Sequence, residues 1–335
     1  MVREKSAHSI AALKNVRDAI VWAEKNLSAA GIYFGHGTDN ALDEAAWLVA
    51  AAIAVSPSKL AKHHRRMITP AARGRLEEFV AQRIATRKPT AYLLHQAWFV
   101  GLPFYVDERV IVPRSLTGEF IQKRFAPWID SGRVRRILDL CTGSGCMAIA
   151  CARAFPSAQV DAVDISNDAL AVARINIARH KLANRVHLLQ SDLFSNLAGR
   201  RYDVIVTNPP YVGRAEMKTL PKEYRHEPRL ALESGASGLD ATTRILRNAA
   251  HFLEPQGVLI VEVGNSKQAL QRKFPGLKFR WLRTTSGDDS VFLVTSKQLT
   301  DRHPRGQRHK SRAILAHPHA RQKSGRNKPP KRVNG

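Results

Sequence analysis

The stretch LDLCTGSGCMAIA, residues 138–150, decides the fold of this 335-residue chain. An apolar, strand-like run leads into a turn that contains Gly143 and Gly145, and small residues then continue as a helix. Glycines at a strand-to-helix turn permit a tight bend and close approach of the backbone to a ligand, and Ala148 permits close packing of the helix on the strand. The pattern indicates a ligand site at the start of an α/β sheet.

The chain around this turn alternates strand-like and helix-like segments. Near-continuous apolar runs are typical of strands covered on both faces, and they occur at residues 134–140, 159–164, 186–192, 202–208, 257–263 and 290–296. Helices are expected between them, one of them with Ser166 as its N-cap. The sequence therefore predicts a doubly wound α/β domain whose ligand lies outside the carboxyl ends of the strands.

Three carboxylates are expected at those strand ends. Asp164 ends the second strand 21 residues after Gly143, a position suited to accepting hydrogen bonds from ribose hydroxyls, and this pair predicts an adenosine-containing cofactor while leaving NAD open. Asp139 lies just inside the first strand and Asp192 ends the third. A rim of three carboxylates repels a pyrophosphate and attracts a cationic sulfonium cofactor that carries an ammonium group. S-adenosylmethionine is therefore the better fit.

The fourth strand leads into VTNPPYVG, residues 206–213. Proline has no backbone N–H and fixes its own φ, so Asn208-Pro209-Pro210-Tyr211 is predicted to form a stiff loop. Such a loop leaves backbone carbonyls unpaired and displays one amide and one aromatic ring. This chemistry suits the binding of a planar substrate group.

The N-terminal ninety residues predict a small helical domain. Its first helix has an apolar face formed by Ile10, Leu13, Val16, Ile20 and Leu27. A second helix is expected to begin near Thr38 or Asp39, with Leu42, Ala46 and Val49 on its apolar face, and Thr69 followed by Pro70 predicts the start of a third, which continues through Leu76, Phe79, Val80 and Ile84. Aromatic and β-branched residues then predict a hairpin connector. The expected organisation is a helical substrate-recognition domain at 1–90, the hairpin at 91–115, the catalytic domain at 116–297 and a disordered tail at 298–335.

The formal net charge of +25 favours polyanionic partners. From residue 301 onward the chain carries eleven Lys or Arg and one Asp, a surplus of +10, and residues 1–299 carry the remaining +15. The tail has few large apolar residues and is expected to be disordered, with contact to rRNA or a ribosome precursor as the preferred role and a merely solvating tail as the alternative.

Cysteine usage and hydropathy indicate a cytoplasmic, non-membrane protein. Cys141, Cys146 and Cys151 are odd in number and close together, so they are interpreted as small buried residues; neither a disulfide nor a metal site is expected. The apolar run at 45–55 is shorter than the about 20 residues that cross a bilayer. The N-terminus MVREKSAHSI lacks the apolar core of a signal peptide.

The NPPY loop after the fourth strand resembles that of Rossmann-like methyltransferases that modify planar amide or exocyclic amine nitrogens. Together with DLCTGSGCMAIA and HEPRLALESGASGLD, residues 10–297 resemble the protein glutamine N5-methyltransferase family nearly end to end. The resemblance implies a class I fold with a mostly parallel, seven-stranded sheet and S-adenosylmethionine as the cofactor. It assigns the cofactor to Asp139, Thr142, Gly143, Gly145, Asp164, Asp192 and Asn208, and the substrate amide to Asn208, Pro209, Pro210 and Tyr211.

The family divides into enzymes for release factors and enzymes for the third large-subunit ribosomal protein. The release-factor branch usually shows a PRPxTE-like stretch, whereas residues 113–119 read PRSLTGE, and AWFVGLPFYVDERVIVPRS resembles the ribosomal-protein branch. The resemblance also implies that Arg114 and Glu119 lie near the pocket, with a surface ion pair as the alternative, and it matches Glu227, Pro228, Gly235 and Gly238 to a family loop. The expected activity is methylation of a ribosomal-protein glutamine. A release-factor enzyme, an amino-methyltransferase of nucleic acid (adenine N6 or rRNA guanine) and a non-catalytic assembly factor remain alternatives.

Overall fold

The computed structural model describes residues 10–301, and the basic tail from residue 302 onward lies outside the described residues. The expected start of the tail at 298 is too early. Helix α10 spans Ser296–Asp301, and the side chain of Leu299 is buried among the apolar residues beneath it. Burial of this leucine extends the folded part of the chain to Asp301.

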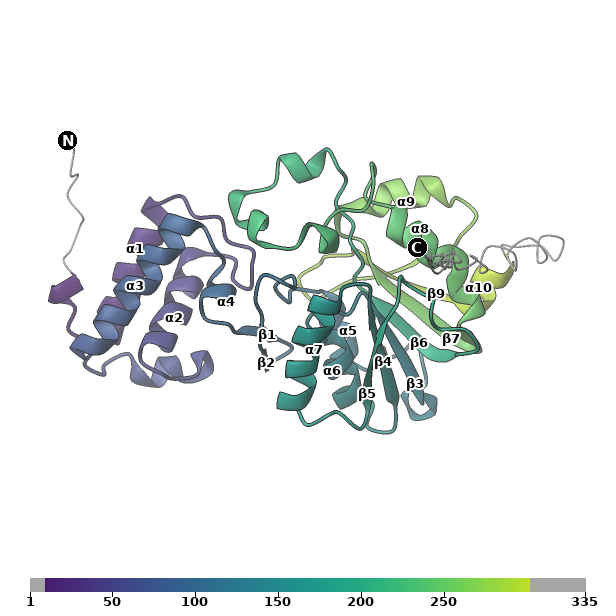
Figure 1. Cartoon of the computed structure of the whole chain (residues 1–335), viewed down its shortest axis with the longest axis horizontal. Coiled ribbons are helices and arrows are strands. Elements are labelled where there is room, and N and C mark those ends of the chain that lie inside the picture. Colours follow the sequence, from purple (N-terminus) through teal and green to yellow (C-terminus); the bar gives the residue numbers. More distant parts are fainter. Residues whose placement is uncertain (1–9, 302–335) are drawn as a thin grey trace, which may run out of the picture. The chain divides into compact units, whose positions relative to one another are not determined.

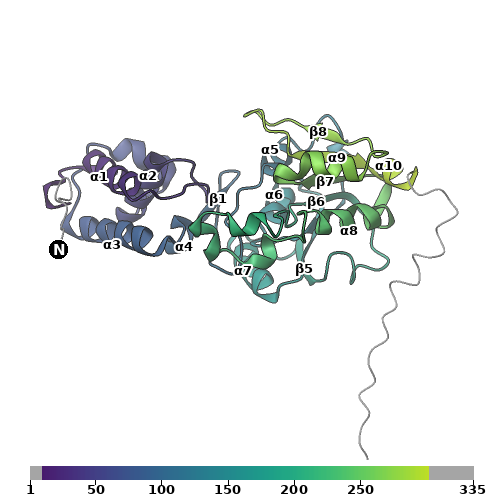
Figure 2. The same ribbon diagram turned by 90° about the horizontal axis from the view of Figure 1, so that it is seen from above.

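The N-terminal part of the chain forms the expected helices, and α1, α2 and α3 pack side by side (Figures 1 and 2). Thr69 caps α3 by accepting a hydrogen bond from the Ala72 N–H at 3.2 Å, with Pro70 at the first helical position, as predicted. The elements are η1 (Ile10–Ala12), α1 (Val16–Ala29), α2 (Ala41–Ala52), η2 (Pro57–His63), α3 (Pro70–Thr86) and α4 (Thr90–Leu93).

Two details of the predicted helices are wrong. The first helix does not run on from Ile10, because Asn15 adopts an extended conformation and caps a helix that begins only at Val16. Leu42 is 49% exposed and lies off the apolar face of α2, which is formed by residues such as Ala45 and Leu48.

A short antiparallel hairpin follows, with strands β1 (Ala97–Phe99) and β2 (Leu102–Phe104), as the sequence predicted. The turn contains Gly101 at φ +78°. Positive φ is accessible to glycine without steric cost, which explains the residue at this point.

The sheet of the following domain contains seven strands in the order β5-β4-β3-β6-β7-β9-β8. The first five are parallel, whereas β9 is antiparallel to both β7 and β8. The strands are β3 (Arg136–Leu140), β4 (Gln159–Asp164), β5 (Val186–Gln190), β6 (Tyr202–Thr207), β7 (Leu253–Glu262), β8 (Arg280–Leu282) and β9 (Val291–Thr295). The helices are α5 (Thr117–Gln122), α6 (Cys146–Ala154), α7 (Asn167–Arg179), α8 (Asp240–Asn248) and α9 (Lys267–Lys273).

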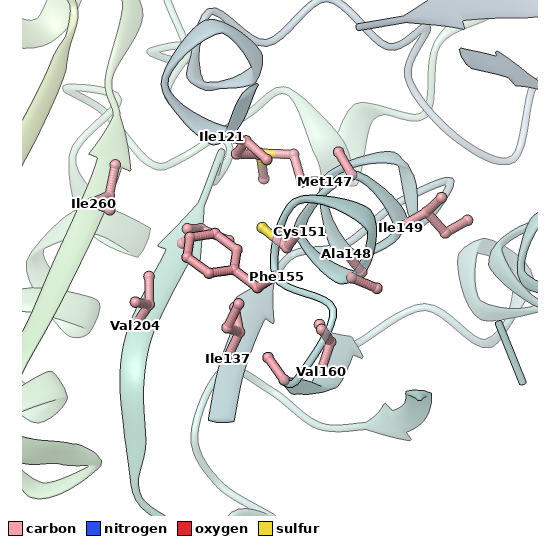
Figure 3. Packing of buried hydrophobic residues seen from close by; sticks show 14 of the residues in the cluster. Ile121, Ile137, Met147, Ala148, Ile149, Cys151, Phe155, Val160, Val204 and Ile260 are labelled. Atoms are coloured by element: carbon pink, nitrogen blue, oxygen red, sulfur yellow. The ribbon is translucent and has the colours of Figure 1, made fainter. Parts of the chain in front are cut away.

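Alternate residues of the central strands pack into two different cores, one on each face of the sheet. On one face, Ile137 and Val204 pack with Cys151 and Phe155 of the α6 region (Figure 3). On the other face, residues such as Leu138 pack with α8, α9 and α10. Because both faces of the sheet are covered, a ligand site is expected at the ends of the parallel strands.

No single helix within residues 10–301 has the length and apolar character needed to cross a membrane. The pair α2 and η2 meets that criterion only when counted together across an 83° bend.

Candidate active site

A cavity of about 350 Å³ opens at the carboxyl ends of β3, β4 and β6. This is the position predicted for a ligand of a doubly wound sheet. We call it the sheet-end cavity. Its lining includes Cys141, Gly143, Val163, Asp164, Ser166, Asp192, Asn208, Pro210, Pro228, Gly235 and Arg244.

The glycine turn forms one wall of this cavity. Gly143 and Gly145 have φ angles of +53° and +79°, where other residues are strained. A Cβ at Gly145 would also lie 3.2 Å from the Cβ of Ala173 in α7. The two glycines are therefore explained by backbone conformation and, for Gly145, by contact with a neighbouring helix.

Asp139 and Thr142 lie beneath the turn and do not line the cavity. The buried carboxylate of Asp139 accepts hydrogen bonds from the Thr142 hydroxyl at 2.6 Å and from the Ala148 N–H at 3.0 Å. Burial raises the pKa of Asp139 to about 7. The structure thus brings two of the three predicted carboxylates to the cavity, and it places the third where it stabilises the turn.

Asp164 links the turn to α7 and lines the cavity. Its Oδ2 accepts the Gly143 N–H at 2.9 Å, and its Oδ1 accepts the Ser166 N–H at 3.0 Å. Ser166 caps α7, as predicted. Burial raises the pKa of Asp164, although these two N–H groups act in the opposite direction.

Asp192 also lines the cavity, and it has a partner that the sequence did not indicate. The guanidinium of Arg244 in α8 donates to both carboxylate oxygens, at 3.0 and 2.7 Å. The hydrogen bond to Asp192 raises the pKa of Arg244. The negative charge of this carboxylate therefore does not act alone on a cationic ligand, because a fixed cation lies beside it.

Asn208 directly follows β6, and its side-chain oxygen is the distinctive atom of the site. Oδ1 is buried and has no hydrogen-bond partner among the described residues, although Asn208 lines the cavity. The neighbouring Thr207 hydroxyl donates to the Leu140 carbonyl at 2.8 Å and ties the end of β6 to β3. Buried polar atoms normally have a partner, so an orphan at a cavity indicates a ligand group.

The other residues of the NPPY loop differ in position. Pro210 lines the cavity, whereas Pro209 is buried and Tyr211 packs against Gly264. A Cβ at Gly264 would lie 2.6 Å from Cε2 of the Tyr211 ring. Burial raises the pKa of the Tyr211 hydroxyl.

The loop that precedes α8 approaches the NPPY loop through its glycines. Gly235 and Gly238 have φ angles of +73° and +74°. A Cβ at Gly238 would lie 2.2 Å from the Tyr211 carbonyl oxygen, and one at Gly235 would lie 1.9 Å from the Asp240 carboxylate. Both glycines are therefore required by close approach of other groups.

A second cavity of about 350 Å³, which we call the front cavity, is lined by Arg114 and Glu119 but not by Asn208. Its other lining residues include Gly35, Gly37, Asp39, Trp98, Phe99, Pro113, Ser115, Thr284 and Ser286. Arg114 and Glu119 do not pair with each other, so the surface ion pair considered for them is absent. The Glu119 carboxylate instead accepts from Lys123 at 2.6 Å and from the Thr285 N–H at 2.9 Å.

Arg114 forms a bidentate ion pair with Glu227, with N–O distances of 2.5 and 2.7 Å. Glu227 is buried and also accepts the Val112 N–H at 3.0 Å. Burial acts to raise the pKa of Glu227, but Arg114 outweighs it and the pKa lies below the ordinary value. The pair fastens the loop after Tyr211 to the segment that follows the hairpin.

His36 was not identified from the sequence, because nothing in its local context distinguishes it. Its buried ring lies 4.5 Å from the Tyr224 ring, and its Nε2 lies 3.7 Å from the Glu227 carboxylate. Burial lowers the pKa of His36 to about 4. Only the three-dimensional structure brings this residue to the Arg114–Glu227 pair.

Two of the three cysteines are buried, as expected. Cys146 and Cys151 are buried in α6, whereas Cys141 is only partly buried, because it belongs to the turn after β3 and lines the cavity. Within residues 10–301, no three His, Cys, Asp or Glu side chains are grouped so that they could bind a metal ion.

The order of the strands, the glycine turn at the end of β3 and the NPPY loop at the end of β6 define a Rossmann-like methyltransferase. Residues 123–235 match the family model of the methyltransferase small domain, and residues 18–94 match that of the PrmC N-terminal domain. A methyltransferase structure from Pyrococcus furiosus is 19% identical, with a TM-score of 0.42 over 58% of this chain and 87% of that chain. A likeness at that level carries no argument about function.

Curated relatives are much more similar. The ribosomal protein uL3 glutamine methyltransferase of Neisseria meningitidis serogroup A is 48% identical over 288 residues, which cover 86% of this chain and 95% of the relative. The protein of the same name from Francisella tularensis subsp. tularensis is 45% identical over 306 residues, covering 89% and 95%. The chain belongs to the family of ribosomal protein uL3 glutamine methyltransferases.

Proposed function

We propose that this chain transfers a methyl group from S-adenosylmethionine to the side-chain amide nitrogen of a glutamine in ribosomal protein uL3. One observation carries the proposal beyond family membership. The Oδ1 atom of Asn208, which directly follows the carboxyl end of β6, is buried and has no hydrogen-bond partner among the described residues. An acceptor without a donor fits a substrate that brings N–H groups. A primary amide brings two of them.

The residues of the sheet-end cavity fit the cofactor. The cavity volume of about 350 Å³ lies within the range of small-molecule sites. The turn at Gly143 allows close backbone approach, the carboxylate of Asp164 provides acceptors for hydroxyl groups and a negative potential for a cation, and Asp192, paired with Arg244, provides further acceptor oxygens. When bound, this cofactor supplies an electrophilic methyl group on a positively charged sulfur.

Asn208 and Pro209 are proposed to orient the substrate amide. An amide nitrogen is a poor nucleophile because its lone pair is delocalised into the carbonyl. The Asn208 Oδ1 and the Pro209 carbonyl oxygen accept its two N–H bonds, fix its direction and stabilise positive charge as it develops. The amide nitrogen would gain the methyl group as the bond from that carbon to sulfur breaks, which leaves a neutral thioether, and it would release one N–H proton to solvent. Tyr211, restrained by its contact with Gly264, stacks on the flat amide group.

The front cavity is proposed to receive the chain that flanks the glutamine. It lies along the segment 113–119 and is lined from the helical region by Gly35, Gly37 and Asp39. We therefore retain the assignment of residues 1–90 to substrate recognition and of 91–115 to the connecting hairpin, and we extend the catalytic assignment from 116–297 to 116–301. Contact of the basic tail with rRNA is also retained as a proposal that rests on charge alone.

The test is a methyl-transfer assay with labelled S-adenosylmethionine. Unmodified uL3, an unmodified release factor and protein-free rRNA are offered separately, and the labelled product is located by mass spectrometry. Label on a single glutamine of uL3, and its loss when that glutamine is replaced by Asn, is the expected result. Label on the release factor, on a base, or on none of the three would overturn the proposal.

A further inference from the structure

The helical region carries a cluster of cations that neither the sheet-end cavity nor the front cavity uses. It comprises Lys14, Arg17, Lys59, Lys62, Arg65 and Arg66, which we call the basic corner. All six side chains are exposed. None of the six forms an ion pair with any residue in the range 10–301.

Backbone hydrogen bonds bring the two segments of the basic corner together. The Val16 N–H donates to the Arg66 carbonyl at 3.0 Å, and the Arg17 N–H donates to the His64 carbonyl at 3.1 Å. The Ile68 N–H donates to the Lys14 carbonyl at 3.2 Å. The cations near the start of α1 are thus fixed beside those that follow η2, and the cluster is a built surface of the domain.

Acidic residues are few around the basic corner, so most of its positive charge is uncompensated. The sequence contains no Asp or Glu between residues 45 and 76. The nearby Asp18 carboxylate is engaged by the backbone N–H groups of Lys14 and Asn15 at 3.1 and 3.3 Å. By contrast, Arg114 and Arg244 near the cavities are each paired with a carboxylate. Mutual repulsion of clustered cations is relieved by a polyanion.

We propose that the basic corner binds RNA through the phosphate backbone. A phosphate chain supplies closely spaced anions that can meet several cations at once, and a net charge of +25 draws such a partner to the chain. Met67, 68% exposed, and the exposed His64 lie among the cations and offer surfaces for unstacked bases. The surface is separate from the methyl-transfer site, so RNA binding does not depend on the activity proposed above.

The test compares two triple variants of the full chain that carry the same net charge. Lys62→Gln/Arg65→Gln/Arg66→Gln neutralises the basic corner, and Arg247→Gln/Arg272→Gln/Lys273→Gln neutralises three exposed cations near α8 and α9. Binding of a fluorescent RNA hairpin is measured by anisotropy across a salt series. Each phosphate contact contributes about 0.7 to 0.9 to the slope of log affinity against log salt, so the first variant should lose about 2 to 3 of that slope and about tenfold or more in affinity at low salt.

The control variant should keep most of the slope, and the swap Lys62→Arg/Arg65→Lys/Arg66→Lys should keep all of it. The basic tail is present in every variant and contributes equally. Equal losses in both neutralised variants, no loss in either, or no RNA binding by the unaltered chain would each overturn the proposal. Loss of binding to poly-glutamate with unchanged RNA binding would overturn it in favour of an acidic protein partner.

Discussion

The buried pair between Arg114 and Glu227 makes a sharp prediction for Glu227→Gln. The substitution keeps the shape of the side chain but removes its charge. Glutamine can still accept one hydrogen bond from Arg114 or from the Val112 N–H, yet its own NH₂ group meets a second donor where a carboxylate oxygen was. A guanidinium whose side chain is only 21% exposed is then left without a counter-charge.

Breaking a buried ion pair by removing one partner costs about 3–5 kcal/mol. Arg114 keeps some access to solvent, so we expect a loss of about 3 kcal/mol in the free energy of unfolding, measured by chemical denaturation at neutral pH. The same loss of anchoring should weaken cofactor binding, because Pro228 follows Glu227 and lines the sheet-end cavity.

The effect should depend on pH with a defined sign. The pKa of Glu227 in the folded protein lies below the ordinary value of 4.5. Its contribution is therefore fully present above that value and disappears as the pH falls through the folded pKa. The unaltered protein and Glu227→Gln should differ most above about pH 5 and converge in more acidic solution.

Asp130→Asn is the matched control, since Asp130 and Arg133 form an ion pair with side chains 64% and 76% exposed. Exposed pairs contribute about 0–1 kcal/mol. A Glu227→Gln variant no less stable than Asp130→Asn, at any pH from 5 to 8, would refute the reasoning about the buried pair.

Three further predictions concern the cavity and its loops. Asp164→Asn should raise the cofactor dissociation constant about tenfold in titration calorimetry, because one acceptor of a backbone N–H becomes a donor; unchanged affinity would count against its place in the site. Burial raises the pKa of Asp139 to about 7, so the unaltered protein should lose stability relative to Asp139→Asn as the pH rises from about 4 to 7, whereas parallel curves would contradict that shift. Gly264→Ala should reduce turnover, because its Cβ collides with Tyr211, while the control Gly74→Ala meets no atom within 4 Å and should leave turnover unchanged; equal turnover in both variants would contradict a role for the ring position.

Local patterns accounted for much of the fold. The strand at 159–164 and the N-cap at Ser166 have the predicted bounds, because an apolar run and a capping residue act over a few neighbours. The three-residue strand β8 was missed, since so short a run has no period to detect and pairs only at the edge of the sheet. Leu42 was misplaced because a helical face is decided by what packs against it.

Long-range contacts explain what the sequence could not predict of the site. Arg244 lies 52 positions from Asp192, and Glu227 lies 113 positions from Arg114, so no local spacing relates the members of either pair. The carboxylate of Asp139 was expected at the rim, but alternation along β3 places it beneath the turn, where donors from Thr142 and Ala148 meet it. Asn208, by contrast, lines the sheet-end cavity, and the role of its buried side-chain oxygen stays a prediction.

The orientation of the substrate amide by Asn208 is tested most directly by Asn208→Ala, with methyl transfer to uL3 and cofactor affinity measured on the same preparation. Removal of one charge-stabilising contact typically lowers turnover by about 10²-fold or more. We predict a loss of that size with cofactor affinity nearly unchanged. Turnover close to that of the unaltered protein would contradict the account.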